Sequence, residues 1–186
     1  MINAVFDACV LYPGSLRDFL LRLAYDGLIV PFWSEEIRDE WFRSLLRNRP
    51  NLWEKLERTR RKMDFHFPNS LVDGYETIIP MLQLPDPNDR HVLAVAIHAK
   101  AKYIVTFNLK HFPKPALEPY EIEAVSPDEI VLQVIQRRTN RAIETIRNHR
   151  AGLSQPSLSA TEYLAMLEKQ GLPQTVAFLR KHEGAI

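Results

Sequence analysis

Short apolar runs alternate with longer amphipathic segments along the first part of the chain. The runs INAVFD, LIVPFW and YIVT each have the length and composition typical of a buried strand. EIEAV predicts a last strand, whereas TIIP is a weak strand candidate because Pro80 limits it to an edge or an end. Strands that alternate with helices predict an α/β fold with a parallel sheet.

Helix signals occupy the segments between these runs. The predicted helices begin at Ser15, Ser34, Pro50 and Asp89. Gly27 is expected to end the first helix, and Glu40 borders the apolar face of the second. In the third helix Trp53 and Leu56 are expected to face inward. The stretch NLKHFPKPALEP predicts a loop.

The last third of the chain has only helical signals. The residues SPDE at 126–129 provide a cap, a proline at the first helical position and two acids in the first turn. Ser159 and Glu162 form a second capping box. The sequence therefore predicts an α/β unit over residues 1–125 and an all-helical extension over residues 126–186.

The composition is that of an ordinary soluble globular protein. The chain has 186 residues, of which 46% are hydrophobic and 25% charged, and these values exclude disordered, collagen-like and coiled-coil classes. No apolar run approaches the roughly 18 residues of a membrane span, and no basic leader precedes an apolar stretch. We expect a cytoplasmic protein that makes no use of a membrane.

The net charge of +1 conceals an uneven distribution of charge. Eight basic and two acidic residues lie from Arg43 to Lys62, and five arginines and one acid lie from Arg137 to Arg150. Between them, the stretch from Asp64 to Asp89 has five acids and no Lys or Arg. Such blocks commonly only solubilise helix faces. They also fit a polyanionic partner that binds beside a site lined by carboxylates.

Polar side chains follow the predicted strands at their carboxyl ends, where ligands bind in doubly wound folds. Asp7 ends the first strand and Asn108 follows YIVT, while Asp86 and Asp89 lie where a loop enters a helix. Glu40 lies in the helix after the second strand. Carboxylates gathered in one cleft repel one another, and a hard cation relieves that repulsion. The alternative is a purely structural role, in which each acid only caps a turn or a helix.

Other chemically suggestive residues have simpler interpretations. Cys9 is alone, so it forms no internal disulfide, and a small buried side chain is favoured over a nucleophile. His91 and His98 fall at different positions of one predicted helix, so they are not expected to pair at a metal. Trp41 is expected to belong to the core rather than to stack on bases.

Four segments occur in the order typical of one known family: VFDACVL, SEEIRDEW, LPDPNDRHVLAVAIHAKAKYIVTFNLKHF and AVSPDEIVLQVI. They resemble the PIN-domain nucleases, and more closely the VapC-type ribonuclease toxins. The resemblance covers residues 2–135 and implies a three-layer sandwich with a central parallel sheet. The segment LSQPSLSATEYLAMLEKQGLP resembles the helical extension of one VapC subgroup.

The resemblance implies an acidic metal site. Asp7, Glu40 and Asp89 match the first, second and third metal-binding and catalytic acids of the family, and Asp86 is an additional acid or shapes the loop. The cation implied is Mg²⁺ or Mn²⁺, which would activate a water for attack on phosphorus.

The fourth position of the family pattern differs in this chain. The family commonly has an acid after the Thr of this strand, whereas Thr106 is followed by Asn108 and then His111. Neither residue supplies an anion, so one metal ion is expected rather than two. Thr106 is expected to hydrogen-bond Asp7 or Asp89 across the strand ends.

The expected activity is that of a metal-dependent endoribonuclease, the toxin of a toxin-antitoxin pair. RNA phosphates would be held by basic side chains. The candidates for this role are Arg43, Arg47, Arg60, Arg61 and Lys62. The apolar positions of the tail predict packing on the main domain, a homodimer contact or a partner peptide, and the resemblance implies an antitoxin protein as that partner.

Two alternatives remain open on the sequence. One is a PIN-like module that binds RNA or protein without cutting, because the fourth position is degenerate. The other is a phosphotransfer protein with an aspartyl nucleophile at Asp7. This second alternative is weakened because Cys9 occupies the position where a phosphatase motif requires another Asp.

Overall fold

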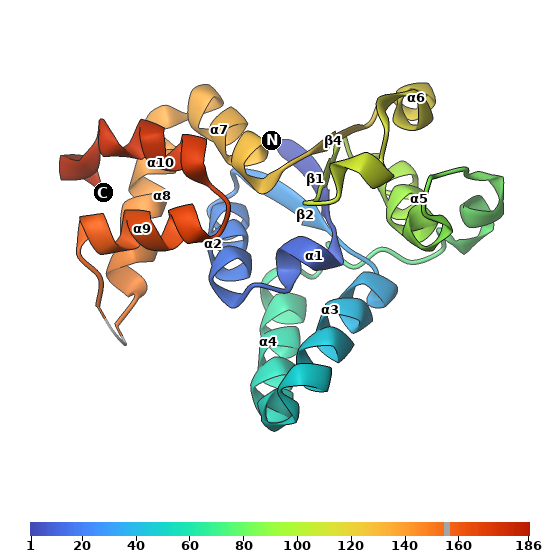
Figure 1. Cartoon of the computed structure of the whole chain (residues 1–186), viewed down its shortest axis with the longest axis horizontal. Helices are drawn as coiled ribbons and strands as arrows, with labels where there is room; N and C mark the ends of the chain where they lie inside the picture. The colour runs from blue at the N-terminus through green and yellow to red at the C-terminus, as the bar shows by residue number, and fades with distance from the viewer. Residues whose placement is uncertain (155–156) are drawn as a thin grey trace.

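The centre of the computed structural model, which describes residues 1–154 and 157–186, is a four-stranded sheet in the order β2-β1-β3-β4 (Figure 1). All three strand pairs are parallel, as the alternating pattern predicts. The strands are β1 (Ile2–Phe6), β2 (Ile29–Phe32), β3 (Tyr103–Val105) and β4 (Glu123–Val125). The predicted α/β class is confirmed.

The middle strands are covered on both faces, which explains their continuous apolar runs. Ala4, Val5 and Phe6 of β1 are fully buried. In the register of the sheet, Val5 pairs with Phe32 of β2 and with Ile104 of β3. This register brings the residues that follow β1 and β3 to the same edge of the sheet.

Helices surround the sheet, with α5 on the right and α2 on the left in Figure 1, while α3 and α4 project below it. The helices of this part are α1 (Ala8–Leu11), α2 (Gly14–Tyr25), α3 (Glu35–Asn48), α4 (Trp53–His66), α5 (Arg90–His98) and α6 (Lys114–Leu117). Short 3-10 turns link them: η1 (Pro50–Leu52), η2 (Glu76–Met81), η3 (Pro87–Asp89), η4 (Leu109–His111) and η5 (Glu118–Tyr120).

Two predictions about local structure are wrong. The TIIP segment belongs to the 3-10 turn η2, not to a strand, because Pro80 has no N–H to give to a strand ladder. The stretch predicted as a loop after β3 contains α6 and two 3-10 turns. These short turns satisfy backbone groups locally and have no repeating apolar pattern to reveal them.

Two details of the predicted helices also change. The first helix predicted from the sequence corresponds to α2. It begins at Gly14, one residue before Ser15, because the Pro13 carbonyl accepts the first helical hydrogen bond. Trp53 is 55% exposed rather than inward. It begins α4 and its ring packs edge-to-face against that of Phe42, whereas Leu56 is buried as predicted.

The tail is all helical, as predicted. It comprises α7 (Pro127–Arg137), α8 (Thr139–Gly152), α9 (Ala160–Lys169), α10 (Pro173–Arg180) and the 3-10 turn η6 (Glu183–Ala185). Both predicted capping boxes, Ser126 with Glu129 and Ser159 with Glu162, are present. Residues 155 and 156, inside the tail segment that carried the resemblance, lie outside the described residues. The domain boundary at 125/126 stays a prediction.

The tail packs against α2, one of the packing modes expected of it. The buried side chain of His149 on α8 connects the two parts. Its Nε2 lies 3.1 Å from Asp18 Oδ2 on α2, and its Nδ1 lies 2.8 Å from the Tyr163 hydroxyl on α9. In the described part of the chain, no helix is both long and apolar enough to cross a membrane.

Candidate functional site

Asp7 follows β1 at the carboxyl edge of the sheet, and its side chain is held by neighbours. It is only 4% exposed. Thr106 Oγ1, at the end of β3, donates to Asp7 Oδ2 at 2.6 Å, and Cys9 Sγ donates to the same oxygen at 3.0 Å. The predicted bond from Thr106 is therefore confirmed for Asp7. Both donors orient one carboxylate oxygen and leave the other for a different ligand.

Cys9 is a supporting residue rather than a nucleophile. Burial, together with the negative charge of Asp7, raises the pKa of its thiol to about 12. The thiolate, which is the reactive form, is therefore scarce at neutral pH. The Cys9 Sγ also accepts a hydrogen bond from the Phe107 N–H at 3.2 Å, which ties the segment after β1 to the segment after β3.

Asp89 forms an acidic group with Asp86 and His111, whose ligand atoms lie within 4.8 Å of one another. His111 Nδ1 lies 2.7 Å from Asp89 Oδ2. Burial raises the pKa of Asp89, and the negative charges of Asp7 and Asp86 raise it further, against the opposing effect of His111. Asp86 also caps its turn by accepting the Asn88 N–H at 2.9 Å, so it has a structural role as well.

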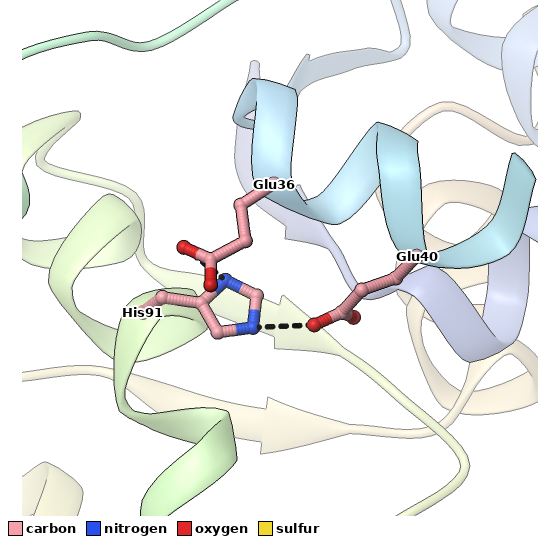
Figure 2. Close-up of side chains that lie close together, drawn as sticks. All are labelled: Glu36, Glu40 and His91. Atoms are coloured by element: carbon pink, nitrogen blue, oxygen red, sulfur yellow. Dashed lines mark ion pairs between the residues drawn. The ribbon is translucent and has the colours of Figure 1, made fainter. Parts of the chain in front are cut away.

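Glu40 belongs to a second group, with Glu36 and His91 (Figure 2). Glu36 and Glu40 lie one turn apart on α3, and both point toward the ring of His91, which comes from the first turn of α5. Burial lowers the pKa of His91, but the hydrogen bond to Glu40 and the negative charges of Glu40, Glu36 and Asp7 outweigh it, so the pKa is raised.

The predicted acids therefore gather at one edge of the sheet, in two groups rather than one. Asp7 acts electrostatically on both groups, through Asp89 on one side and His91 on the other. Among the described residues, no single group with ligand atoms within 4.8 Å contains Asp7, Glu40 and Asp89 together. Their assignment as joint metal ligands stays a prediction.

Asn108 and His111 follow β3, as the sequence indicates. The Asn108 N–H donates to Thr106 Oγ1 at 2.9 Å, so it supports the hydroxyl that orients Asp7. His111 contacts Asp89 directly. Of the two residues at the fourth position, His111 thus contacts Asp89 and Asn108 acts on Asp7 through Thr106.

The predicted basic residues lie on α3 and α4. Arg43, Arg47, Arg61 and Lys62 are exposed, while Arg43 forms an ion pair with Asp39 and Arg60 forms one with Glu35.

Sequence reasoning missed three residues of this region: Glu36, Arg38 and His91. Arg38 is buried and pairs with Glu35 and Asp64. Glu36 has one visible signal, since it precedes Glu40 by four residues on a helix. His91 has none, because its partners lie on another element.

Comparison with known proteins covers both parts of the chain. Residues 3–110 match the PIN domain family, and residues 127–181 match the VapC50 C-terminal domain. A Mycobacterium tuberculosis (strain ATCC 25618 / H37Rv) protein named "Putative ribonuclease VapC50" is 40% identical over 84 residues, which are 43% of this chain and 49% of that protein. The match thus spans about half the length of this curated relative. No solved structure matches.

Proposed function

Because the match over residues 3–110 covers more than half of the 186 residues, the chain belongs to the PIN-domain family, and we propose that it is a metal-dependent endoribonuclease of the VapC type. The observation that supports the activity best is the charge interaction between Asp7 and Asp89 at the carboxyl edge of the sheet. Asp7 is buried and Asp89 is partly buried, and the negative charge of Asp7 contributes to raising the pKa of Asp89. Such an arrangement favours a bound cation.

The residues present fit a hard divalent cation, Mg²⁺ or Mn²⁺. Asp7, Asp89, Glu40 and Asp86 offer carboxylate oxygens, the ligands that these ions prefer. Burial raises the pKa of Asp89, and the negative charges of Asp7 and Asp86, which a bound cation would offset, raise it further. When bound, such an ion lowers the pKa of a water molecule and stabilises negative charge on a phosphate.

The protein's own side chains would position the reaction. Thr106 fixes one oxygen of Asp7, and Asn108 supports Thr106. His111 orients Asp89. RNA would be held through its phosphates by the basic residues of α3 and α4. These are Arg43, Arg47, Arg60, Arg61 and Lys62.

The biological role proposed is that of the toxin in a type II toxin-antitoxin pair that acts in the cytoplasm. The support is the match to the VapC50 C-terminal domain and to the mycobacterial relative. A cognate antitoxin would cover the acidic edge with a basic side chain, since such a side chain replaces the charge of a cation. A homodimer remains part of the proposal.

The decisive experiment neutralises one of the two carboxylates, Asp7 or Asp89, at a time. Asp7→Asn and Asp89→Asn are expected to abolish RNA cleavage in Mg²⁺ or Mn²⁺. Asp39→Asn, which changes an acid on α3 that pairs with Arg43, is expected to retain it. Circular dichroism would verify that each variant folds. Robust cleavage by folded Asp7→Asn protein in EDTA would overturn the mechanism.

A second function is favoured by one observation. At the fourth position, His111 contacts Asp89 where the family pattern commonly has an acid. A PIN-like module that binds RNA or protein without cutting would tolerate this difference. Calorimetric titration separates the two functions: no binding at millimolar Mg²⁺ and Mn²⁺ supports the module, and binding supports the enzyme.

A further inference from the structure

A cleft opens between α2, α4 and two helices of the tail, α8 and α9. Its volume is about 820 Å³, which lies within the range of roughly 300–1,000 Å³ that is typical of ligand sites. Asp7, Glu40 and Asp89 are not among the residues that line it. In Figure 1, α8 and α9 lie to the left of the sheet, whereas α5, which follows Asp89, lies to the right. The cleft is therefore separate from the acidic edge.

The cleft has more positive than negative charge. The described residues that line it include four Lys or Arg side chains and one carboxylate, Asp18. Oδ2 of Asp18 already lies 3.1 Å from Nε2 of His149. Two of the cations have partners as well, because Arg17 donates to backbone carbonyls and Arg22 forms an ion pair with Asp26. The excess charge therefore comes from the two remaining cations.

These two cations are Lys55 and Lys62, both exposed on α4. Neither forms an ion pair with a carboxylate of the described residues. They lie two helical turns apart on the same face of α4, about 10 Å along the helix axis. This spacing suits a ligand with two or more negative groups better than a single small anion.

Three exposed aromatic side chains form a cluster beside the lysines. Tyr25, at the end of α2, is 59% exposed, and Phe65, in the last turn of α4, is 81% exposed. The ring centroid of His66 lies 5.4 Å from that of Tyr25 and 5.0 Å from that of Phe65. Tyr25 and His66 line the cleft, and Phe65 extends the cluster beyond it. Single exposed aromatic side chains are common, whereas a contiguous patch marks a binding surface.

Cations beside exposed rings are the combination that single-stranded nucleic acids recognise. Their phosphates interact with basic side chains, and their bases stack on aromatic faces. A small anion would use the lysines without the rings, and an apolar peptide would use the rings without the lysines. We propose that this cleft binds single-stranded RNA, with phosphates beside Lys55 and Lys62 and bases stacked on Tyr25 and Phe65.

The proposal rests on RNA being the ligand, as in the proposed function, and adds a contact region away from the acidic edge. Such a region strengthens the binding of substrate without touching the phosphodiester that is cleaved. Tyr25→Ala and Phe65→Ala are therefore expected to raise KM for RNA cleavage and to leave kcat unchanged.

Fluorescence anisotropy with a labelled single-stranded oligoadenylate tests the site on the full-length protein, in EDTA to prevent cleavage. Tyr25→Ala and Phe65→Ala are each expected to weaken RNA binding by about fivefold to a hundredfold. They are expected to leave the slope of log K against log salt unchanged, because neither side chain carries a charge. Lys55→Ala is expected to reduce that slope by about 0.7.

Two control variants accompany these measurements. Tyr25→Phe keeps the ring and is expected to keep the affinity for RNA. Tyr120→Ala removes an aromatic ring that is 40% exposed on η5, outside the cleft, and is expected to bind RNA like the unaltered protein. Because Tyr25 and Phe65 are exposed, their variants are expected to fold, which circular dichroism verifies.

Unchanged affinity in both Tyr25→Ala and Phe65→Ala would overturn the proposal, as would an equal loss in Tyr120→Ala. Competition by free AMP as effective as that by oligoadenylate would show a site for single nucleotides instead. Loss of self-association in Phe65→Ala, with RNA binding unchanged, would show that a second copy of the chain covers the cluster. RNA cleavage that persists while both ring variants bind RNA normally refutes this site alone. Weaker RNA binding by the ring variants of a protein that cleaves no RNA refutes the ribonuclease proposal alone.

Discussion

The carboxylate of Asp7 depends on Thr106 for its orientation. Thr106 is fully buried, and its hydroxyl donates to Asp7 at 2.6 Å while accepting the Asn108 N–H at 2.9 Å. Thr106→Val removes both bonds. We expect a loss of about 1–3 kcal/mol in the free energy of unfolding, and metal binding weakened by about tenfold to a hundredfold. Urea denaturation and calorimetric titration with Mn²⁺ measure the two effects.

The conservative variant Thr106→Ser is the control, because it retains the hydroxyl and removes only a methyl group. It is expected to restore metal binding to near the original affinity. Equal losses of affinity in Thr106→Ser and Thr106→Val would show that the methyl packing, and not the hydrogen bond to Asp7, supports the site.

The raised pKa of Cys9 leads to a separate prediction about its reactivity. With a pKa of about 12, roughly one thiol in ten thousand is ionised at pH 8. Iodoacetamide is therefore expected to label Cys9 slowly in the folded protein and rapidly after denaturation in urea, as measured by mass spectrometry. Rapid labelling of the folded protein would contradict the supporting role.

The contacts of the site residues that follow the strands could be predicted from the sequence, whereas the contacts of the site residues on helices could not. The bond between Asp7 and Thr106 follows from two parallel strands that end at the same edge, a geometry that the apolar runs already predict. The contact of His91 with Glu36 and Glu40 depends on how α3 and α5 are rotated relative to each other. That rotation results from packing across the whole unit, and no local pattern specifies it.

At the scale of elements, Asp128 joins two helices of the tail. It lies in the first turn of α7, where the sequence predicts an acid that favours its own helix. Its carboxylate also accepts the N–H groups of Gln174 and Thr175, both at 2.8 Å, at the start of α10. The second role was not predictable, because it requires knowing that α10 begins beside α7.

Replacement of Asp128 tests this connection. Asp128→Ala leaves two N–H groups of α10 without acceptors and is expected to cost about 2 kcal/mol of stability. Hydrogen exchange would localise the loss to α10, and denaturation would give its size. Asp128→Asn keeps one carbonyl acceptor and is expected to lose less. Unchanged exchange in α10 for Asp128→Ala would contradict the proposed capping.

The contact between α2 and α8 is expected to depend on pH. The hydrogen bond from His149 to Asp18 lowers the pKa of that carboxyl, and the charges of His149 and Arg17 lower it further. A carboxyl whose pKa is lower in the folded protein stabilises the fold above its ordinary pKa of about 4, and this contribution is lost as the pH falls further. The melting temperature is thus expected to fall below about pH 4.

Asp18→Asn is expected to remove part of this acid dependence, whereas Asp73→Asn, which changes an exposed acid, is expected to leave it unchanged. Melting curves recorded by circular dichroism from pH 3 to pH 7 compare the three proteins. Parallel curves for the unaltered protein and Asp18→Asn would show that the carboxylate of Asp18 contributes nothing to the docking of α8.

Across the whole molecule, the two basic stretches of the sequence have different roles. The arginines of the tail are largely engaged in structure. Arg141 donates to the Asp26 carbonyl at 2.6 Å, Arg150 donates to the Leu158 carbonyl at 2.9 Å, and Arg137 donates to the Tyr103 hydroxyl at 3.4 Å. In the sequence, two similar basic stretches flank an acidic segment. In the fold these two stretches are not equivalent, because the arginines of the second one are largely engaged in structure.

On α3 and α4, Arg43 and Arg60 form ion pairs. Arg47, Arg61 and Lys62 are exposed and form no ion pair among the described residues, and α3 links these cations to the acids. It has Glu36 and Glu40 near its start and Arg43 and Arg47 toward its end. One helix thus runs from the carboxylate groups to an exposed basic surface. This arrangement suits an RNA strand whose phosphates follow the basic residues while one phosphodiester reaches the acidic edge.

The salt dependence of RNA binding separates the two kinds of basic residue. Arg61→Ala and Lys62→Ala each remove an exposed cation, and each is expected to reduce the slope of log K against log salt by about 0.7 for single-stranded RNA. Arg141→Ala is expected to destabilise the fold and to leave the slope unchanged, because its guanidinium is bound to Asp26. Fluorescence anisotropy across a KCl series measures the slopes. If only Arg141→Ala changed the slope, RNA would bind on the tail, and the basic surface of α3 and α4 would have no part in it.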